Sequence, residues 1–129
     1  MPDIIALDFG GRRIGVARAN SAVRLPEPLP SIDRKVSDDN QIFEILKSLE
    51  PEQIILGLPK NTNGDDTEQT KATREFHKLL TEKLGTSVRL VDEALSTVQS
   101  DKWRTRYPKA NEDSLAACII LERYFGDSI

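Results

Sequence analysis

The sequence predicts a mixed α/β fold, in which an antiparallel meander of strands is followed by parallel strands and flanked by helices. Apolar runs of strand length at residues 4–9 and 14–19 are separated by a glycine turn, which is typical of a β-hairpin. Later strand-length runs alternate with segments of helical periodicity, and this alternation requires parallel pairing through helical crossovers. With 129 residues, the chain has the size of one domain, so we expect residues 1–129 to form a single unit.

The first third of the chain is expected to contain the hairpin and one further strand or loop. Gly10 and Gly11 provide the turn between the strands at residues 4–9 and 14–19. The segment 23–34 contains three prolines, which cannot donate to a central ladder. This segment is therefore expected to be an edge strand or a loop.

Two helices are predicted around a buried strand at residues 53–58. The first begins with the N-cap chemistry of residues 38–40 and has an apolar face formed by Ile42, Ile45, Leu46 and Leu49. The second begins at a capping box of Asp65 and Glu68 and ends at Gly85. Its inner face is expected to consist of Ala72, Phe76, Leu79 and Leu80.

The last part of the chain predicts a strand at residues 87–91, a short helix after Ser96 and a final helix at about residues 113–125. The final helix is apolar on nearly all sides, so we expect it to be buried. It contains Cys118, the single cysteine, which cannot form an internal disulfide. We interpret Cys118 as a small core side chain.

Composition and charge restrict the function classes. The chain is 38% hydrophobic and 30% charged, and it has no apolar run of membrane length and no signal-peptide pattern. These features predict a cytoplasmic protein without membrane association. The net charge of −3 argues against strong nonspecific binding to duplex nucleic acid. No long exposed apolar stripe is evident, which favours a monomer or a weak homodimer.

Acidic side chains lie at the ends of two predicted strands and at the start of the last helix. Asp8 lies near the end of the first strand, and Asp92 and Glu93 directly follow a later one; ligands of open α/β sheets gather at the carboxyl ends of strands. Asp113 begins the final helix, whose dipole favours an ionised carboxylate. Carboxylates that converge on one edge repel one another unless cations are bound, and hard oxygen donors suit one or two Mg²⁺ or Mn²⁺ ions. The chain has one histidine and one cysteine, far apart in sequence, which argues against zinc.

Each acid also has a purely structural interpretation. Asp8 precedes two glycines and suits a turn, while Glu93 suits an exposed strand end. Asp113 suits the first turn of a helix. The hypothesis of a metal site that hydrolyses phosphodiester bonds therefore depends on the three side chains meeting at one rim.

Two groups of cations are candidates for contact with nucleic acid. One lies at the hairpin turn, and the other lies in residues 102–109, where cations alternate with aromatic side chains. A polar loop at residues 60–64 follows another strand. The candidate residues are Arg12, Arg13, Asn61, Lys102, Trp103, Arg104, Arg106 and Lys109. The alternative is that Trp103 packs on the core while the cations are solvated.

Four motifs together resemble the YqgF family, also called RuvX, of Holliday-junction resolvases. They are DFGGRRIGVA at residues 8–17, LGLPKNTNG at 56–64, VDEALST at 91–97 and DSLAACIILERYF at 113–125. They occur in the family's order and span nearly the whole chain. The resemblance departs at Ala94, where the family usually has an arginine directly after the Asp–Glu pair.

This resemblance implies an RNase H-like nuclease domain related to RuvC resolvases. It implies a metal-dependent enzyme that processes the 5′ end of the pre-16S ribosomal RNA or resolves branched DNA. The family's acids correspond to Asp8, Glu93 and Asp113, with Asp92 beside them as a further metal ligand.

Two other classes of function remain open on the residues alone. An RNA-binding ribosome-assembly factor with weakened catalysis fits the departure at Ala94, because alanine cannot contact a phosphate as arginine does. The Asp-x-Gly hairpin also occurs in sugar kinases and actin-like ATPases. Those proteins enclose the nucleotide between two such domains, and 129 residues supply one.

Overall fold

The structure is a computed structural model that describes residues 3–59, 63, 65–93 and 97–127. The side chains of residues 93, 97–100 and 127 lie outside this description. Its elements are β1 (Asp3–Phe9), β2 (Arg13–Asn20), β3 (Glu27–Asp33), α1 (Asp39–Ser48), β4 (Pro51–Pro59), α2 (Glu68–Leu84), β5 (Val88–Glu93), α3 (Thr97–Arg106) and α4 (Glu112–Asp127).

The described strands form one sheet in the order β3-β2-β1-β4-β5. The β1, β2 and β3 strands pair antiparallel, whereas β4 pairs parallel with β1 and with β5. The proline-rich β3 lies at an edge of the sheet, where missing backbone donors cost least. The predicted meander followed by parallel strands is confirmed.

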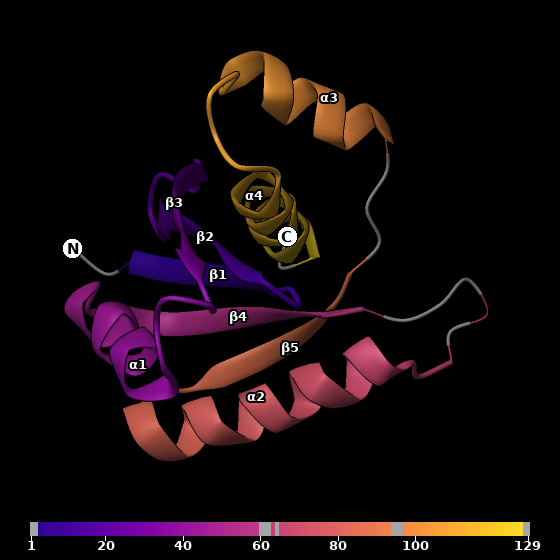
Figure 1. Ribbon diagram of the computed structural model, residues 1–129. Helices are drawn as coiled ribbons and strands as arrows, with labels where there is room; N and C mark the ends of the chain where they lie inside the picture. The colour runs from indigo at the N-terminus through magenta and orange to yellow at the C-terminus, as the bar shows by residue number, and fades with distance from the viewer. Residues whose placement is uncertain (1–2, 60–62, 64, 94–96, 128–129) are drawn as a thin grey trace.

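Helices cover both faces of this sheet. Figure 1 shows α1 and α2 on one side, and α4 on the other side with α3 beyond it. The core is divided in the same way, because successive strand residues alternate between the faces. In β1, Ala6 packs in the cluster under α4, whereas Leu7 packs in the cluster under α1 and α2. The carboxyl ends of β1, β4 and β5 lie at the same end of the sheet, as their parallel pairing requires.

The helix boundaries follow local capping chemistry. The N-cap of α1 is Asp38, whose side chain accepts from the backbone N–H of Gln41, as the N-cap prediction required. The predicted capping box of α2 is wrong, because its N-cap is Thr67 and its partner is Thr70. The buried Thr70 hydroxyl also donates to the carbonyl of Pro59, which ties the start of α2 to the end of β4. The last turn of α2 ends as predicted, at Gly85 in the left-handed conformation.

The inner faces of α1 and α2 differ from prediction at one position each. Ile45 and Leu79, both expected to face the core, are 40% and 39% exposed. Phe43 and Thr73 are buried in their helices instead. The helical periodicity of the sequence located the apolar face of each helix. It did not determine which residues at the edges of that face contact the sheet.

The α4 helix is buried as predicted, and Cys118 is fully buried within it. Burial, followed by the nearby charges of Glu122 and Glu27, raises the pKa of the Cys118 thiol to about 12. The thiol therefore stays protonated near neutral pH and behaves as a core side chain. Among the described residues, no helix is long and apolar enough to cross a membrane.

Candidate active site at the strand ends

Asp8 and Asp113 come together around Gly15 of the hairpin. Asp8 of β1 is paired with Gly15 of β2, and residues paired across an antiparallel ladder present their side chains on the same face. A Cβ placed on Gly15 would lie 1.9 Å from the carbonyl oxygen of Asp113. The first turn of α4 therefore lies directly over Gly15, on the face of the sheet to which Asp8 belongs.

The Asp113 carboxylate lies beside the hairpin turn. Its Oδ1 atom would be 3.9 Å from a Cβ placed on Gly10, the second residue after Asp8. Asp113 and Asp8 are both half-buried, so each is accessible from the rim. Two of the three predicted acids thus share one rim of the sheet, although they are separated by most of the chain.

Ser114 holds the first turn of α4 in this position. Its buried hydroxyl donates to the carbonyl of Leu29 in β3 at 2.7 Å and accepts from the backbone N–H of Val16 in β2 at 3.3 Å. The register between β2 and β3 shifts between Ile14 and Val16. The hydroxyl therefore supplies a partner for a strand N–H where the ladder is irregular. These two hydrogen bonds fix Ser114, and with it the position of Asp113, which directly precedes it.

The acidic pair of β5 divides between the two faces. Val91 packs in the cluster under α4, whereas Leu90 packs toward the cluster under α1 and α2. Strand alternation places the exposed Asp92 on the same face as Leu90, opposite to the face of Asp8. This placement argues against Asp92 as an additional metal ligand.

Glu93 is at the last position of β5, paired with Pro59 at the end of β4. Glu93 is two residues after Val91 in β5, and β4 is the strand that lies between β5 and β1. Its side chain, like the predicted residue Asn61 and the departure at Ala94, lies outside the described residues.

The donor set on this rim fits a hard divalent cation. Carboxylate oxygens such as those of Asp8 and Asp113 are the ligands that Mg²⁺ and Mn²⁺ prefer. No group of three His, Cys, Asp or Glu side chains that could hold a metal ion occurs among the side chains that the structure describes. The third predicted ligand, Glu93, is not in that set.

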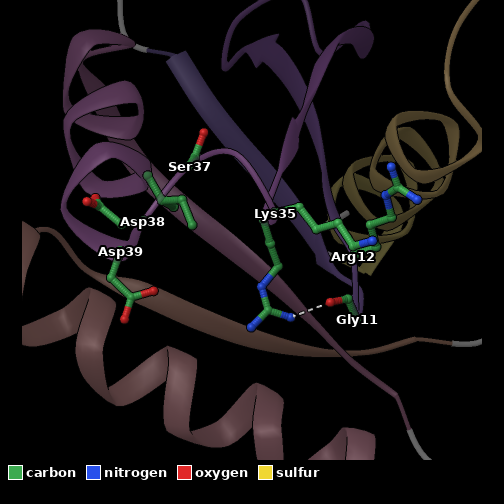
Figure 2. A pocket seen from close by; sticks show the side chains of 8 residues that line it. Gly11, Arg12, Lys35, Ser37, Asp38 and Asp39 are labelled. Carbon is green, nitrogen blue, oxygen red and sulfur yellow. Dashed lines mark hydrogen bonds between the residues drawn. The ribbon is translucent and has the colours of Figure 1, made fainter.

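The hairpin turn that carries Asp8 is held from the opposite face of the sheet. The Arg34 guanidinium donates to the carbonyls of Gly10 at 2.7 Å and of Gly11 at 3.0 Å, the second of which is drawn in Figure 2. Its Cζ atom lies 4.3 Å from the centre of the Phe9 ring, and Gln69 donates to the Phe9 carbonyl. Arg34 and Gln69, neither of which was predicted, thus fix the backbone after Asp8.

Replacing Arg34 by alanine is expected to lower the free energy of unfolding by about 1–3 kcal/mol. Hydrogen bonds from a charged donor contribute in this range, and the two carbonyls lose that donor. Urea denaturation measures the change. The matched control is Arg74→Ala, because Arg74 forms an exposed ion pair with Asp66 at 3.4 Å, and such pairs contribute little. Equal stability of the two variants would show that the hydrogen bonds from Arg34 do not stabilise the hairpin turn.

The two arginines of the turn are exposed on the rim. Arg13 is exposed, and the Arg12 side chain, 58% exposed, has its Nη2 atom 3.9 Å from a carboxylate oxygen of Asp33. Both arginines follow Asp8 by a few residues in the sequence, at the turn between β1 and β2. Their placement is consistent with contact to a phosphate backbone.

The basic-aromatic segment in and after α3 is used largely by the fold itself. Trp103 is 1% exposed and belongs to the core cluster under α4, so the prediction that it stacks on bases is contradicted and the packing alternative holds. Lys102 pairs with Glu122. Arg104 donates to the carbonyls of Pro108 and Ala110 at 3.1 and 2.7 Å.

Three cations of this segment are exposed, and one of them, Lys102, is paired with Glu122. Arg106 is exposed and lies over the rings of Trp103 and Tyr107, at 5.8 and 6.0 Å from their centres. Lys109 is exposed in the turn before α4. The segment therefore offers a smaller basic surface than its sequence suggested.

Comparison with known proteins agrees with this architecture. A family model described as RuvX: Holliday junction resolvase matches residues 2–127. A relative from Alcanivorax borkumensis, described as a candidate pre-16S rRNA nuclease, is 40% identical over 130 residues, which cover 97% of each chain.

Two solved resolvases have the same fold at low sequence identity. RuvC of Thermus thermophilus superposes with a TM-score of 0.62 at 10% identity, covering 98% of this chain and 96% of that one. The fowlpox virus Holliday junction resolvase gives 0.59 at 16% identity, covering 98% of each chain. The predicted RNase H-like fold is confirmed.

Proposed function

The chain belongs to the RuvX family, and on this premise we propose that it is a divalent-metal-dependent nuclease that hydrolyses phosphodiester bonds in structured nucleic acid. The observation that carries the proposal is the placement of Asp113 over Gly15, on the face and at the rim where Asp8 lies. Carboxylates from two distant segments that gather at one rim repel each other, and a bound divalent cation offsets that repulsion.

We propose Asp8 and Asp113 as metal-binding residues and Glu93 as the third. Bound Mg²⁺ or Mn²⁺ stabilises charge on the attacking and leaving oxygens of an in-line phosphoryl displacement. Asp8 is fixed by the hairpin turn under Arg34, and Asp113 is fixed by the bond from Ser114 to β3. These supports hold the carboxylates in place before substrate arrives, which lowers the cost of organising the site.

For the substrate, we propose the 5′ region of the pre-16S ribosomal RNA, with cleavage that leaves a 5′-phosphate. The name of the Alcanivorax relative supports RNA. A four-way DNA junction is the second candidate, favoured by the resolvases that share the fold. Arg12 and Arg13 are placed to meet the phosphate backbone as it approaches the rim.

Titration of Mn²⁺ tests both the chemistry and the substrate. We expect the protein to cleave an end-labelled pre-16S RNA fragment in proportion to Mn²⁺ occupancy, and EDTA to stop cleavage. A four-way DNA junction in parallel reactions reports the substrate preference. RNA binding without Mn²⁺-stimulated cleavage of either substrate would contradict the nuclease function and favour an RNA-binding assembly factor.

A further inference from the structure

Arg13 begins β2 directly opposite Gly10, across the turn of the hairpin. The Gly10 backbone N–H donates to the Arg13 carbonyl at 3.0 Å, so this pair continues the ladder after the pairing of Phe9 with Ile14. Residues opposite each other in an antiparallel ladder project to the same face, with Cβ atoms about 4.5–5.5 Å apart. Because Oδ1 of Asp113 would be 3.9 Å from a Cβ placed on Gly10, the Arg13 side chain starts within about 10 Å of that carboxylate.

Strand alternation independently places Arg13 on the face of the proposed metal-binding acids. Ile14 packs in the cluster under α1 and α2, so its neighbours Arg13 and Gly15 belong to the face of α4. Asp8 is paired with Gly15 on that face, and the first turn of α4 lies over Gly15. Arg13 is therefore the next residue of β2 on this face toward the rim.

The charge of Arg13 is available to a ligand. Arg13 is exposed, and its guanidinium group forms no hydrogen bond or ion pair with any residue that the structure describes. Asp33 of β3 is its ladder partner on the other side and could have paired with it. The Asp33 carboxylate instead accepts from the Lys35 backbone N–H at 2.9 Å and lies 3.9 Å from Nη2 of Arg12. Arg12 thus has an acidic partner, whereas Arg13 has none among the described residues.

The backbone that carries Arg13 is fixed relative to Asp113. Arg34 holds the hairpin turn through two backbone carbonyls, and Ser114 holds the first turn of α4 against β2 and β3. A cation that projects from such a braced turn can stabilise negative charge with little reorganisation. This is the arrangement that phosphoryl transfer requires of its cations.

We propose that Arg13 binds a non-bridging oxygen of the phosphate that is cleaved, whereas Arg12 contacts the substrate backbone only outside the metal site. Arginine recognises phosphate through two parallel N–H donors, and such a donor stabilises the charge that develops on the equatorial oxygens. An arginine that served only to balance the acids would pair with one of them, and Arg13 pairs with none whose side chain the structure describes. The inference rests on the proposed nuclease function and adds a substrate-binding residue to its metal site.

Single-turnover cleavage of the pre-16S RNA fragment at saturating RNA and Mn²⁺ tests this role. We expect Arg13→Ala to cleave on the order of 100-fold more slowly, the loss typical of one donor that stabilises transition-state charge. Arg13→Lys keeps the charge without the two-donor geometry, and we expect its rate to be within about tenfold of the parent rate. The matched comparison is Arg12→Ala, which loses a weak exposed ion pair and is expected to slow by no more than about threefold. Equal losses in Arg12→Ala and Arg13→Ala would overturn the assignment.

Binding of Mn²⁺ to the free protein, measured by isothermal titration calorimetry, gives a readout without cleavage. A positive charge about 10 Å from the acids opposes a divalent cation, so Arg13→Ala is expected to bind Mn²⁺ about twofold or more tightly at low salt. Arg18→Ala, further along the same strand, is the control for removal of one positive charge, and its effect is expected to be smaller. Loss of a residue that only supported the turn would displace the acids, so weaker Mn²⁺ binding in Arg13→Ala would overturn the proposal.

These outcomes separate the role of Arg13 from the nuclease function. A parent protein that binds Mn²⁺ but cleaves neither RNA nor a four-way junction would contradict the nuclease function itself. A parent protein that cleaves, with Arg13→Ala cleaving at the same rate, would retain the nuclease function and overturn only the assignment of Arg13.

Discussion

Replacing Asp8 by asparagine is expected to reduce the rate of metal-dependent cleavage by on the order of 10³-fold while leaving the fold intact. Asparagine has the shape of aspartate but lacks the charge that a divalent cation requires. A bound metal supplies several kcal/mol of charge stabilisation to phosphoryl transfer, and each 1.4 kcal/mol corresponds to about tenfold in rate. Asp8 is half-buried at the rim, so we expect the free energy of unfolding to stay within about 1 kcal/mol of the parent value.

The comparison variant for this experiment is Asp92→Asn. Asp92 is exposed on the face of the sheet opposite to that of Asp8, although both acids lie near the ends of strands. We expect this variant to retain most of the activity. Single-turnover cleavage at saturating Mn²⁺ measures the rates, and urea denaturation confirms folding. Cleavage by Asp8→Asn at the parent rate would remove Asp8 from the site, and a large loss in Asp92→Asn would contradict the face assignment.

The topology was predictable from the sequence because it depends on periodicity, which is local information. The glycine turn after residue 9 predicts the hairpin, and the alternation of strands and helices after residue 50 predicts the parallel half. The prolines of β3 predict an edge strand. These signals gave the fold class and placed Asp8 at a strand end and Asp113 at a helix start.

The errors arose where tertiary contacts decide between similar local choices. Asp65 and Thr67 are both good N-cap residues, but Thr67 is adjacent to the contact between Thr70 and Pro59 and becomes the cap. Trp103 is amphipathic, and its exposure depends on α4, which packs against it from another part of the chain. A one-residue shift along a strand reverses the face of a side chain, so the pair Asp92 and Glu93 could not be separated by sequence alone.

The supports of the site were not found by sequence reasoning. Gly15 interrupts an apolar strand, which signals close approach of another backbone, but nothing local names that partner. Ser114 and Arg34 resemble ordinary polar residues in the sequence. Their roles exist only because β3 passes beside α4 and the hairpin turn. Sequence reasoning thus found the candidate acids and missed the residues that fix them.

Gly15→Ala is the most direct test of the close approach that joins Asp8 to Asp113. A Cβ at this position would lie 1.9 Å from the Asp113 carbonyl oxygen and 2.8 Å from the Ser114 amide nitrogen. These are backbone atoms that cannot rotate away, so α4 must shift as a whole. We expect a loss of about 3 kcal/mol or more in the free energy of unfolding, at the upper end of the cost of overpacking a core.

The matched control is Gly11→Ala in the same hairpin turn, since no atom lies within 4 Å of a Cβ placed there. Urea denaturation measures both variants, and the reactivity of the buried Cys118 thiol in α4 reports opening of that helix independently. In Gly15→Ala the shift of α4 also moves Asp113 away from Asp8, so cleavage should fall even under conditions where the variant remains folded. If both variants unfold at the same urea concentration and cleave at the parent rate, α4 does not lie against β2 at this point, and the geometric argument for a shared metal site fails.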